Sequence, residues 1–596
     1  MRKHLPQPAG WRHRYPLFPW PLAAVAATAL VVVLPFLAFG SPSGHDFEFH
    51  LNTWMDAAGQ WKQGIIYPRW AALAQWGYGD ARFIFYPPLS WMLGAALGTV
   101  LPWKWVPGIY IWLALTLSGC SMYVVARQWL DQTNAICAAA LYAANPYYLI
   151  IVYWRSAFAE LLAGALLPWL LLYTWRLQKR GSSAVLPLAL TLAAAWLTNI
   201  PAAVMITYSF VLLLALAAVT RRSFMVLGYG AVAAFLGAGL AAFFLLPAAC
   251  EKSWVSLAQV LSPGVRPVEN FLFTAIGDRD HDRFNLLVSV VASAEIFLTV
   301  LALAFLSRRT SPTAEKPATA FQNSDDPDST SPAPADERGS ESLVPFLVLP
   351  AAPALLMFSI TAFAWAHLPL LRFLQFPWRW LLCLSLILAV SVPLAFRRTT
   401  LRLLICFALL AVLVFCSVHI QAPSWEDAAG SAAILESHRT GQGYKDVDEY
   451  IPADADNYEI KQDAPLITAS GQSQASFGIQ AWTPESRLLR AVVARPGILT
   501  LRLFNYPSWL ATVNGHPVSA ESDPTTGQMM VPVSAGENQI RISFTRTWDR
   551  TAGGIISLVF ILALLVARVR FSRRVHRHDS SHPRGEAASS SFPPCG

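Results

Sequence analysis

Charged residues are scarce in this sequence. Only 13% of the 596 residues are Asp, Glu, Lys or Arg, whereas 55% are hydrophobic. A soluble domain carries about 25% charged residues. The composition therefore excludes an ordinary soluble globular protein, and the mean hydropathy of +0.42 indicates the same.

Cysteine is scarce too, and no two of the seven cysteines are spaced as metal ligands are. The stretch 421–551 contains none. The sequence therefore indicates neither a disulfide framework nor a zinc site. It also lacks a Gly-rich phosphate loop after a strand and a G-x-S-x-G elbow, which argues against a nucleotide-binding fold and against a serine hydrolase of that type.

Positive charge is what the sequence has in excess, with a net charge of +8. The basic residues sit in short clusters at the ends of apolar runs, which is the orientation signal of a membrane protein. We therefore expect membrane lipids as partners and no nucleic acid.

Apolar runs of about 18 or more residues, long enough to span a bilayer, recur along the chain. About twelve spans place a basic cluster on the cytoplasmic side after every even-numbered span. The first run could instead be a signal peptide, but its apolar core of about 20 residues exceeds the usual length of about 7–15. The predicted spans are 20–39, 106–126, 132–150, 158–175, 183–198, 202–220, 224–247, 286–307, 343–362, 378–396, 400–419 and 553–570.

The run 83–101 is the ambiguous one. Counted as a span, it would send every later basic cluster to the wrong side of the membrane. We therefore expect it to form a short interfacial or re-entrant helix that begins at Pro87-Pro88.

These spans divide the chain into a membrane domain and an outer domain. We predict an α-helical polytopic membrane domain and, before the last helix, an extracytoplasmic β-sandwich. The predicted segments are 1–19 (basic, cytoplasmic), 20–420 (membrane domain, with 41–104 as first outer loop and 308–342 as disordered cytoplasmic linker), 421–551 (outer domain), 552–571 (final span) and 572–596 (disordered cytoplasmic tail).

The outer domain shows strand patterns in its second half. Residues 498–504 and 539–544 alternate apolar and polar side chains, and Asn514-Gly515 between them is a strong tight-turn dipeptide. Such a domain can bind glycan, cover an active site or pack against the membrane domain, and the sequence favours packing or covering.

Asp46 and His50 follow the first span directly. They are four residues apart, so on a helix they share a face. Such a pair can hold a substrate hydroxyl and take its proton. A solvated loop with an incidental Asp and His is the alternative interpretation.

Further polar residues gather in the predicted outer loops. Carboxylates and arginines together suit a lipid-linked phosphate, because the guanidinium fork donates two parallel hydrogen bonds. Taken singly, each residue can also be an ion-pair partner, an interface anchor or part of a solvated loop. The candidates beside Asp46 and His50 are Glu48, Tyr67, Arg69, Tyr86, Arg155, Glu160, Arg279, His281, Arg372 and Arg379.

The first outer loop resembles a known family. Its pattern G-H-D-F-E-F-H…Y-P-R-W…F-Y-P-P-L is similar to polytopic GT-C glycosyltransferases and, more closely, to the bacterial membrane family labelled 6-pyruvoyl-tetrahydropterin synthase-related. Residues 374–380, 448–452 and 506–509 fit that family too. The pterin label is not taken as chemistry, because nothing here matches a histidine zinc site.

The resemblance implies transfer of a sugar from a polyprenyl-phosphate donor on the outer face. In that superfamily an acidic residue of the first outer loop acts as base or positions the acceptor, and by position this residue is Asp46. The superfamily often has two adjacent acids, whereas here Phe47 separates Asp46 from Glu48. A divalent cation as cofactor is therefore left open, and no metal ligands are assigned.

We accordingly predict an inverting membrane glycosyltransferase of the bacterial cytoplasmic membrane, with its active side facing the periplasm or exterior. Asp46 is the predicted base, and the acceptor is an envelope glycan, lipid or protein. The alternative is a non-catalytic membrane protein that transports or presents envelope polymers. That alternative needs ionisable residues along a path through the spans, and the sequence has few at mid-span.

Overall fold

The structure is a computed structural model that describes residues 19–310, 344–396, 398–419, 425–426, 428–469 and 475–580. The predicted N-terminal segment 1–19, the linker 308–342 and the tail 572–596 lie largely outside these residues.

Apolar helices dominate the described part of the chain. Ten of them are long and apolar enough to cross a membrane, or up to 12 if two bent helix pairs are counted as spans, so the prediction of a polytopic membrane protein is confirmed. The helices are α1 (Pro19–Val33), α2 (Phe36–Phe39), α3 (Phe47–Lys62), α4 (Ala74–Gly77), α5 (Arg82–Phe85), α6 (Pro88–Val100), α7 (Val106–Ala126), α8 (Gln132–Ala143), α9 (Pro146–Ile150), α10 (Phe158–Gly164), α11 (Leu167–Arg180), α12 (Val185–Thr198), α13 (Ile200–Arg221), α14 (Met225–Leu240), α15 (Ala242–Cys250), α16 (Arg279–Thr310), α17 (Val344–Leu356), α18 (Ala362–His367), α19 (Leu381–Ala395), α20 (Thr399–His419), α21 (Ala428–Thr440) and α22 (Trp548–Ser580).

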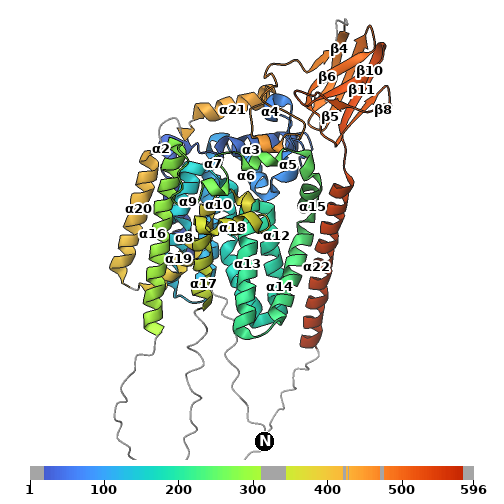
Figure 1. Cartoon of the computed structure of the whole chain (residues 1–596). Coiled ribbons are helices and arrows are strands. Elements are labelled where there is room, and N and C mark those ends of the chain that lie inside the picture. Colours follow the sequence, from blue (N-terminus) through green and yellow to red (C-terminus); the bar gives the residue numbers. More distant parts are fainter. Residues whose placement is uncertain are drawn as a thin grey trace, which may run out of the picture.

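The spans form one bundle (Figure 1). Helices α3 and α21 lie across one end of it, and the β-strands stand beyond that end. Helix α22 leads from the strands back along the side of the bundle, and it continues past residue 571, where the predicted last span ends.

Two of the predicted spans, 224–247 and 343–362, are bent in the structure. The pair α14–α15 bends by 77°, and the chain bends by 92° between α17 and α18. At the first bend, Ser557 of α22 accepts a hydrogen bond from the backbone N–H of Phe243 (2.9 Å) and donates one to the carbonyl of Gly239 (3.1 Å). A hydroxyl that satisfies the freed backbone groups makes such a break tolerable inside a membrane. The second bend follows a helix that contains Pro350 and Pro353.

The run 83–101 folds as two short helices, α5 and α6. Helix α6 has 13 residues, fewer than the about 20 that a span needs. Its first residue is Pro88, whose missing N–H costs nothing in the first helical turn.

The strands of the outer region form two antiparallel sheets, with orders β3-β6-β10-β9 and β4-β5-β11-β7-β8. Side chains of both sheets enter one apolar core, which includes Leu489, Leu501 and Ile540, so the predicted β-sandwich is confirmed. A separate pair, β1 (Ser41–Pro42) and β2 (Trp425–Glu426), ties the first outer loop to the segment after α20. The sandwich strands are β3 (Ile467–Ala469), β4 (Ala475–Thr483), β5 (Ser486–Val493), β6 (Gly497–Phe504), β7 (Trp509–Val513), β8 (His516–Val518), β9 (Glu521–Ser522), β10 (Gln528–Val533) and β11 (Gly536–Phe544).

Because α6 is too short to cross the membrane, we predict that both of its ends lie on the same side. A reporter fused after Leu101 should lie on the same side of the membrane as one fused after Ser43, because the chain between them does not cross. A reporter after Arg127, beyond α7, should lie on the opposite side and serves as the control. Opposite sides for Ser43 and Leu101 would make 83–101 a true span.

Candidate active site at the start of α3

Asp46 is the residue immediately before α3. Its side chain makes no capping hydrogen bond to the helix. Its backbone N–H donates to the carbonyl of Arg155, at 2.9 Å, and its side chain is 42% exposed. The carboxylate is thus fixed through its backbone while remaining open to a ligand.

The turn before Asp46 is held by close backbone contact. A Cβ on Gly44 would lie 2.3 Å from the carbonyl oxygen of Trp154, so only glycine fits there. The N–H of Gly44 donates to Ser156 Oγ (2.9 Å), which in turn donates to the carbonyl of Pro42 (3.0 Å).

Arg155 ends a short π-helix, Ile151–Arg155. Such widened turns are rare and occur frequently at functional sites. Here the π-helix brings the buried guanidinium of Arg155 beneath Asp46, with Nη2 at 4.0 Å from Asp46 Oδ2. The other terminal nitrogen, Nη1, donates to Glu160 Oε2 at 2.8 Å.

Glu160 is the centre of this buried network. Its Oε2 also lies 3.3 Å from Nε of Arg379, although that nitrogen is not aligned for a hydrogen bond. The hydroxyl of Tyr147 donates to the other oxygen of Glu160. Both guanidinium groups face the ring of Phe376, at 5.5 Å for Arg155 and 5.0 Å for Arg379.

In this network the carboxylate of Asp46 is accessible, whereas Arg155 and Arg379 are buried. Asp46 and Glu160 balance the charges of Arg155 and Arg379, so the group as a whole is neutral. At 4.0 Å the Asp46 contact is too long for a hydrogen bond. Asp46 can therefore accept a proton or a hydrogen bond from a ligand, and Nη2 of Arg155 can donate to an anion.

His50 and Tyr86 border this group. The ring of His50 stacks on Phe158 at 5.2 Å, and burial lowers the pKa of His50 to about 4. Its Nδ1 is buried with no hydrogen-bond partner among the residues that the structure describes. Burial and the charge of Asp46 raise the pKa of Tyr86 well above its usual value, so its hydroxyl stays protonated.

The other candidates of the first loop lie elsewhere. Glu48 is exposed. The guanidinium of Arg69 lies 4.3 Å from the centre of the Tyr67 ring, and that ring contacts Phe243 of α15 at 5.9 Å. Burial is the main cause of the lowered pKa of Arg69, whose further charged neighbours are Arg550 and Glu251. The structure thus places Tyr67 and Arg69 toward the junction with the β-sandwich.

Three later candidates are not joined to the Asp46 network by any contact among the described residues. Arg279 and Arg372 are exposed, and Arg372 faces the ring of Phe373 at 4.9 Å. His281 is hydrogen-bonded to Asp282 and Asn270 in its own loop, at 3.0 and 3.1 Å.

The sequence analysis did not identify Arg82, whose buried guanidinium pairs with two carboxylates. Arg82 is fully buried and forms an ion pair with Asp80 at 2.7 Å and a second one with Asp446 of the outer region. Its Nη1 also donates to Thr53 of α3 at 2.9 Å. The second ion pair joins residues that are 364 positions apart in the chain, which no local pattern reveals.

Tyr147 and Glu295 were also missed. Glu295 is a buried carboxylic group within span α16 that accepts a hydrogen bond from Ser385 of α19 at 2.8 Å. An acidic residue within the candidate span Arg279–Ser307 was a signal in the sequence, since such residues are rare in spans.

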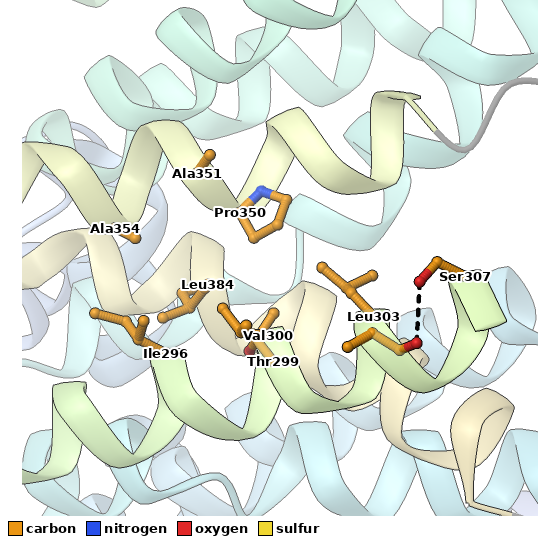
Figure 2. Close-up of a pocket in the computed structure, with 10 residues that line it drawn as sticks. Ile296, Thr299, Val300, Leu303, Ser307, Pro350, Ala351, Ala354 and Leu384 are labelled. Atoms are coloured by element: carbon orange, nitrogen blue, oxygen red, sulfur yellow. Dashed lines mark hydrogen bonds between the residues drawn. The ribbon is translucent and has the colours of Figure 1, made fainter.

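A cavity of about 310 Å³ lies between α16, α17 and α19 (Figure 2). No ionisable side chain lines it, so it does not offer the chemistry of the Asp46 network. Its lining residues are Ile296, Thr299, Val300, Leu303, Ala304, Ser307, Pro350, Ala351, Ala354 and Leu384. Within the described part of the chain, no group of three or more His, Cys, Asp or Glu residues is placed to hold a metal ion.

Residues 83–424, more than half of the chain, match the family model described as "6-pyruvoyl-tetrahydropterin synthase related domain; membrane protein". The chain belongs to this family. The predicted resemblance to this family is therefore confirmed. The matched residues include α6 to α20 and most of the Asp46 network, whereas Asp46 itself precedes them.

This member of the 6-pyruvoyl-tetrahydropterin synthase-related family is 26% identical over 261 residues to an uncharacterized protein of Lactococcus lactis subsp. cremoris (strain MG1363). The match covers 41% of this chain and 40% of that protein, so it spans less than half of the relative.

Two solved structures show further similarity. Arabinofuranosyltransferase AftD from Mycobacteria has a TM-score of 0.37 and 16% identity, over 71% of this chain and 27% of that one. An Archaeoglobus fulgidus oligosaccharyltransferase has a TM-score of 0.36 and 13% identity, over 72% of this chain and 56% of that one.

The network predicts that Glu160→Gln destabilises the protein. Removing the one carboxylate that serves two buried guanidinium groups should lower the free energy of unfolding by about 3 kcal/mol. Unfolding of the purified protein in mixed detergent micelles measures the change, with the exposed Glu459→Gln as matched control. Equal stability of the two variants would contradict the role of Glu160.

Proposed function

We propose that this protein is a membrane glycosyltransferase that moves a sugar from a polyprenyl-phosphate donor to an envelope acceptor on the outer face of a bacterial cytoplasmic membrane. The observation that carries the proposal is Asp46, an accessible carboxylate fixed by its backbone beside the buried Arg155. It lies where the first span meets the outer loop, which is where a lipid-anchored substrate meets a water-borne one.

The residues then have the following roles. Asp46 takes the proton of an acceptor hydroxyl, and the acceptor oxygen attacks the anomeric carbon of the donor sugar. The bond from that carbon to the phosphate oxygen breaks, and the polyprenyl phosphate leaves with the bonding electrons. One displacement of this kind inverts the configuration of the sugar.

Arg155 suits the leaving phosphate, because a guanidinium stays charged and can donate two parallel hydrogen bonds. Glu160 keeps this guanidinium in place through Nη1, so Nη2 remains available. Stabilising the charge that develops on a leaving group often contributes most to the rate of such a reaction. Tyr86, held in its protonated form, is placed to orient Asp46 or the acceptor.

Asp46→Asn should leave the protein inserted in the membrane but reduce transfer by about 10²–10⁴-fold, the usual effect of losing a general base. Surface sugars of a deletion strain that carries either wild type or Asp46→Asn, at matched membrane levels, measure this loss. Asp454→Asn, an exposed acid of the outer region, is the matched control and should restore the sugar like wild type. Equal restoration by Asp46→Asn would favour transport or presentation of polymers instead.

A further inference from the structure

A segment of the outer region, 446–450, is built into the first outer loop. The side chain of Gln75 donates to the carbonyl of Val447 at 3.0 Å, and the N–H of Ala81 donates to the carbonyl of Tyr450 at 3.1 Å. The ring of Tyr450 lies 6.1 Å from that of Phe49 on α3. These contacts fix the segment beside the residues that follow Asp46.

The acidic side chains of this segment have structural partners, with one exception. Asp446 pairs with Arg82, and Asp448 accepts hydrogen bonds from Asn457 (2.6 Å) and Tyr458 (2.9 Å). Glu449 accepts only from its own backbone N–H among the described residues.

The charges around Glu449 are of its own sign. They are the carboxylates of Asp446, Asp46 and Asp448, and burial together with these charges raises the pKa of Glu449 to about 7. The nearby Arg82 is already occupied by Asp80, Asp446 and Thr53. A partly buried carboxylate without a counter-charge lowers the stability of the fold. If this position served the fold alone, an uncharged side chain such as Gln would be more stable there.

The same group of rings holds a second polar atom that lacks a partner. His50 is 1% exposed, its Nδ1 is unpaired within the described residues, and its ring lies 5.6 Å from Phe49. Tyr86 contacts Phe49 at 4.9 Å. A ligand rich in hydroxyl groups would supply the donors that Glu449 lacks.

We propose that Glu449 is a second carboxylate of the acceptor site. It accepts a hydrogen bond from one hydroxyl of the acceptor sugar, while Asp46 deprotonates another hydroxyl of that sugar. The ligand class is therefore a sugar with at least two free hydroxyl groups, and the inference rests on the proposed function.

This role predicts a pH dependence. Glu449 accepts strongly only when ionised, so acceptor binding should strengthen as the pH rises through about 7 and weaken below it. The charged groups that act on Glu449 are Asp46 of the first loop and Asp446 and Asp448 of its own segment. Its neighbour Tyr450 is the adjacent titratable group, and Arg82, Asp80 and Tyr86 in turn surround Tyr450.

The test adds purified full-length variants to a detergent extract of deletion-strain membranes, which contains the native lipid-linked donors and the unmodified acceptor. Diluting the acceptor gives an apparent KM. Glu449→Gln should raise this KM about tenfold or more, as expected for a lost hydrogen bond to a charged group, with a smaller change in kcat. It should also abolish the rise in acceptor affinity from about pH 6 to about pH 8, because an amide does not titrate in that range. Glu449→Asp should restore part of the affinity, and Glu459→Gln should match wild type.

An unchanged KM and pH profile for Glu449→Gln would overturn the proposal. So would a loss of activity that follows a loss of thermal stability and is not eased by Glu449→Asp, since that pattern marks a structural residue. If wild type transfers nothing, the proposed function fails and this inference with it. If wild type is active and Asp46→Asn equals it, only the role of Asp46 fails, and the Glu449 comparison still decides.

Discussion

The ion network around Glu160 is the constraint on which the rest of the site depends. Two guanidinium groups inside a helix bundle would each be costly without a counter-charge, and Glu160 serves both. It thereby fixes Arg155 at the end of the π-helix and Arg379 in the short 3-10 helix before α19. Asp46 completes the charge balance from above and remains 42% exposed, because its backbone rather than its carboxylate holds it. The same set of residues thus forms both the buried ion pairs and the exposed carboxylate of Asp46.

The outer region is joined to the first outer loop and α3 by direct contacts. Asp446 forms an ion pair with Arg82 of the first outer loop, and His438 of α21 is hydrogen-bonded to Asn52 of α3 at 3.0 Å. The strands of the sandwich begin later in the chain than both of these residues. Arg550 at the start of α22 pairs with Glu251 at 2.6 Å, and Tyr506, which follows strand β6, donates a hydrogen bond to the same carboxylate at 2.6 Å. Residues 438 and 446 therefore contact α3 and the first outer loop directly, although they lie more than 360 positions further along the chain.

Much of the fold followed from the sequence, because hydrophobic length and the placement of basic residues act locally. The two bends did not, since that at α14–α15 depends on Ser557, which lies 314 positions from Phe243. Asp46, Arg155, Glu160 and Arg379 were chosen as outer polar residues, and the structure brings them together. Tyr67, Arg69, Arg279, His281 and Arg372 satisfied the same rule but lie apart, because sidedness does not determine distance within a face. Glu449 lies in the segment 448–452, which fits the family, but no local pattern gives it a role, because its position beside Asp46 depends on contacts between distant segments.

The most direct measurement is of the donor itself. Lipid extracts from a deletion strain and from its parent should be compared for polyprenyl-phosphate-linked sugars, together with the sugars of the cell surface. We predict that one lipid-linked sugar accumulates when the protein is absent and that the same sugar disappears from the surface. Unchanged lipid-linked sugars with an intact surface would contradict a role in glycosyl transfer.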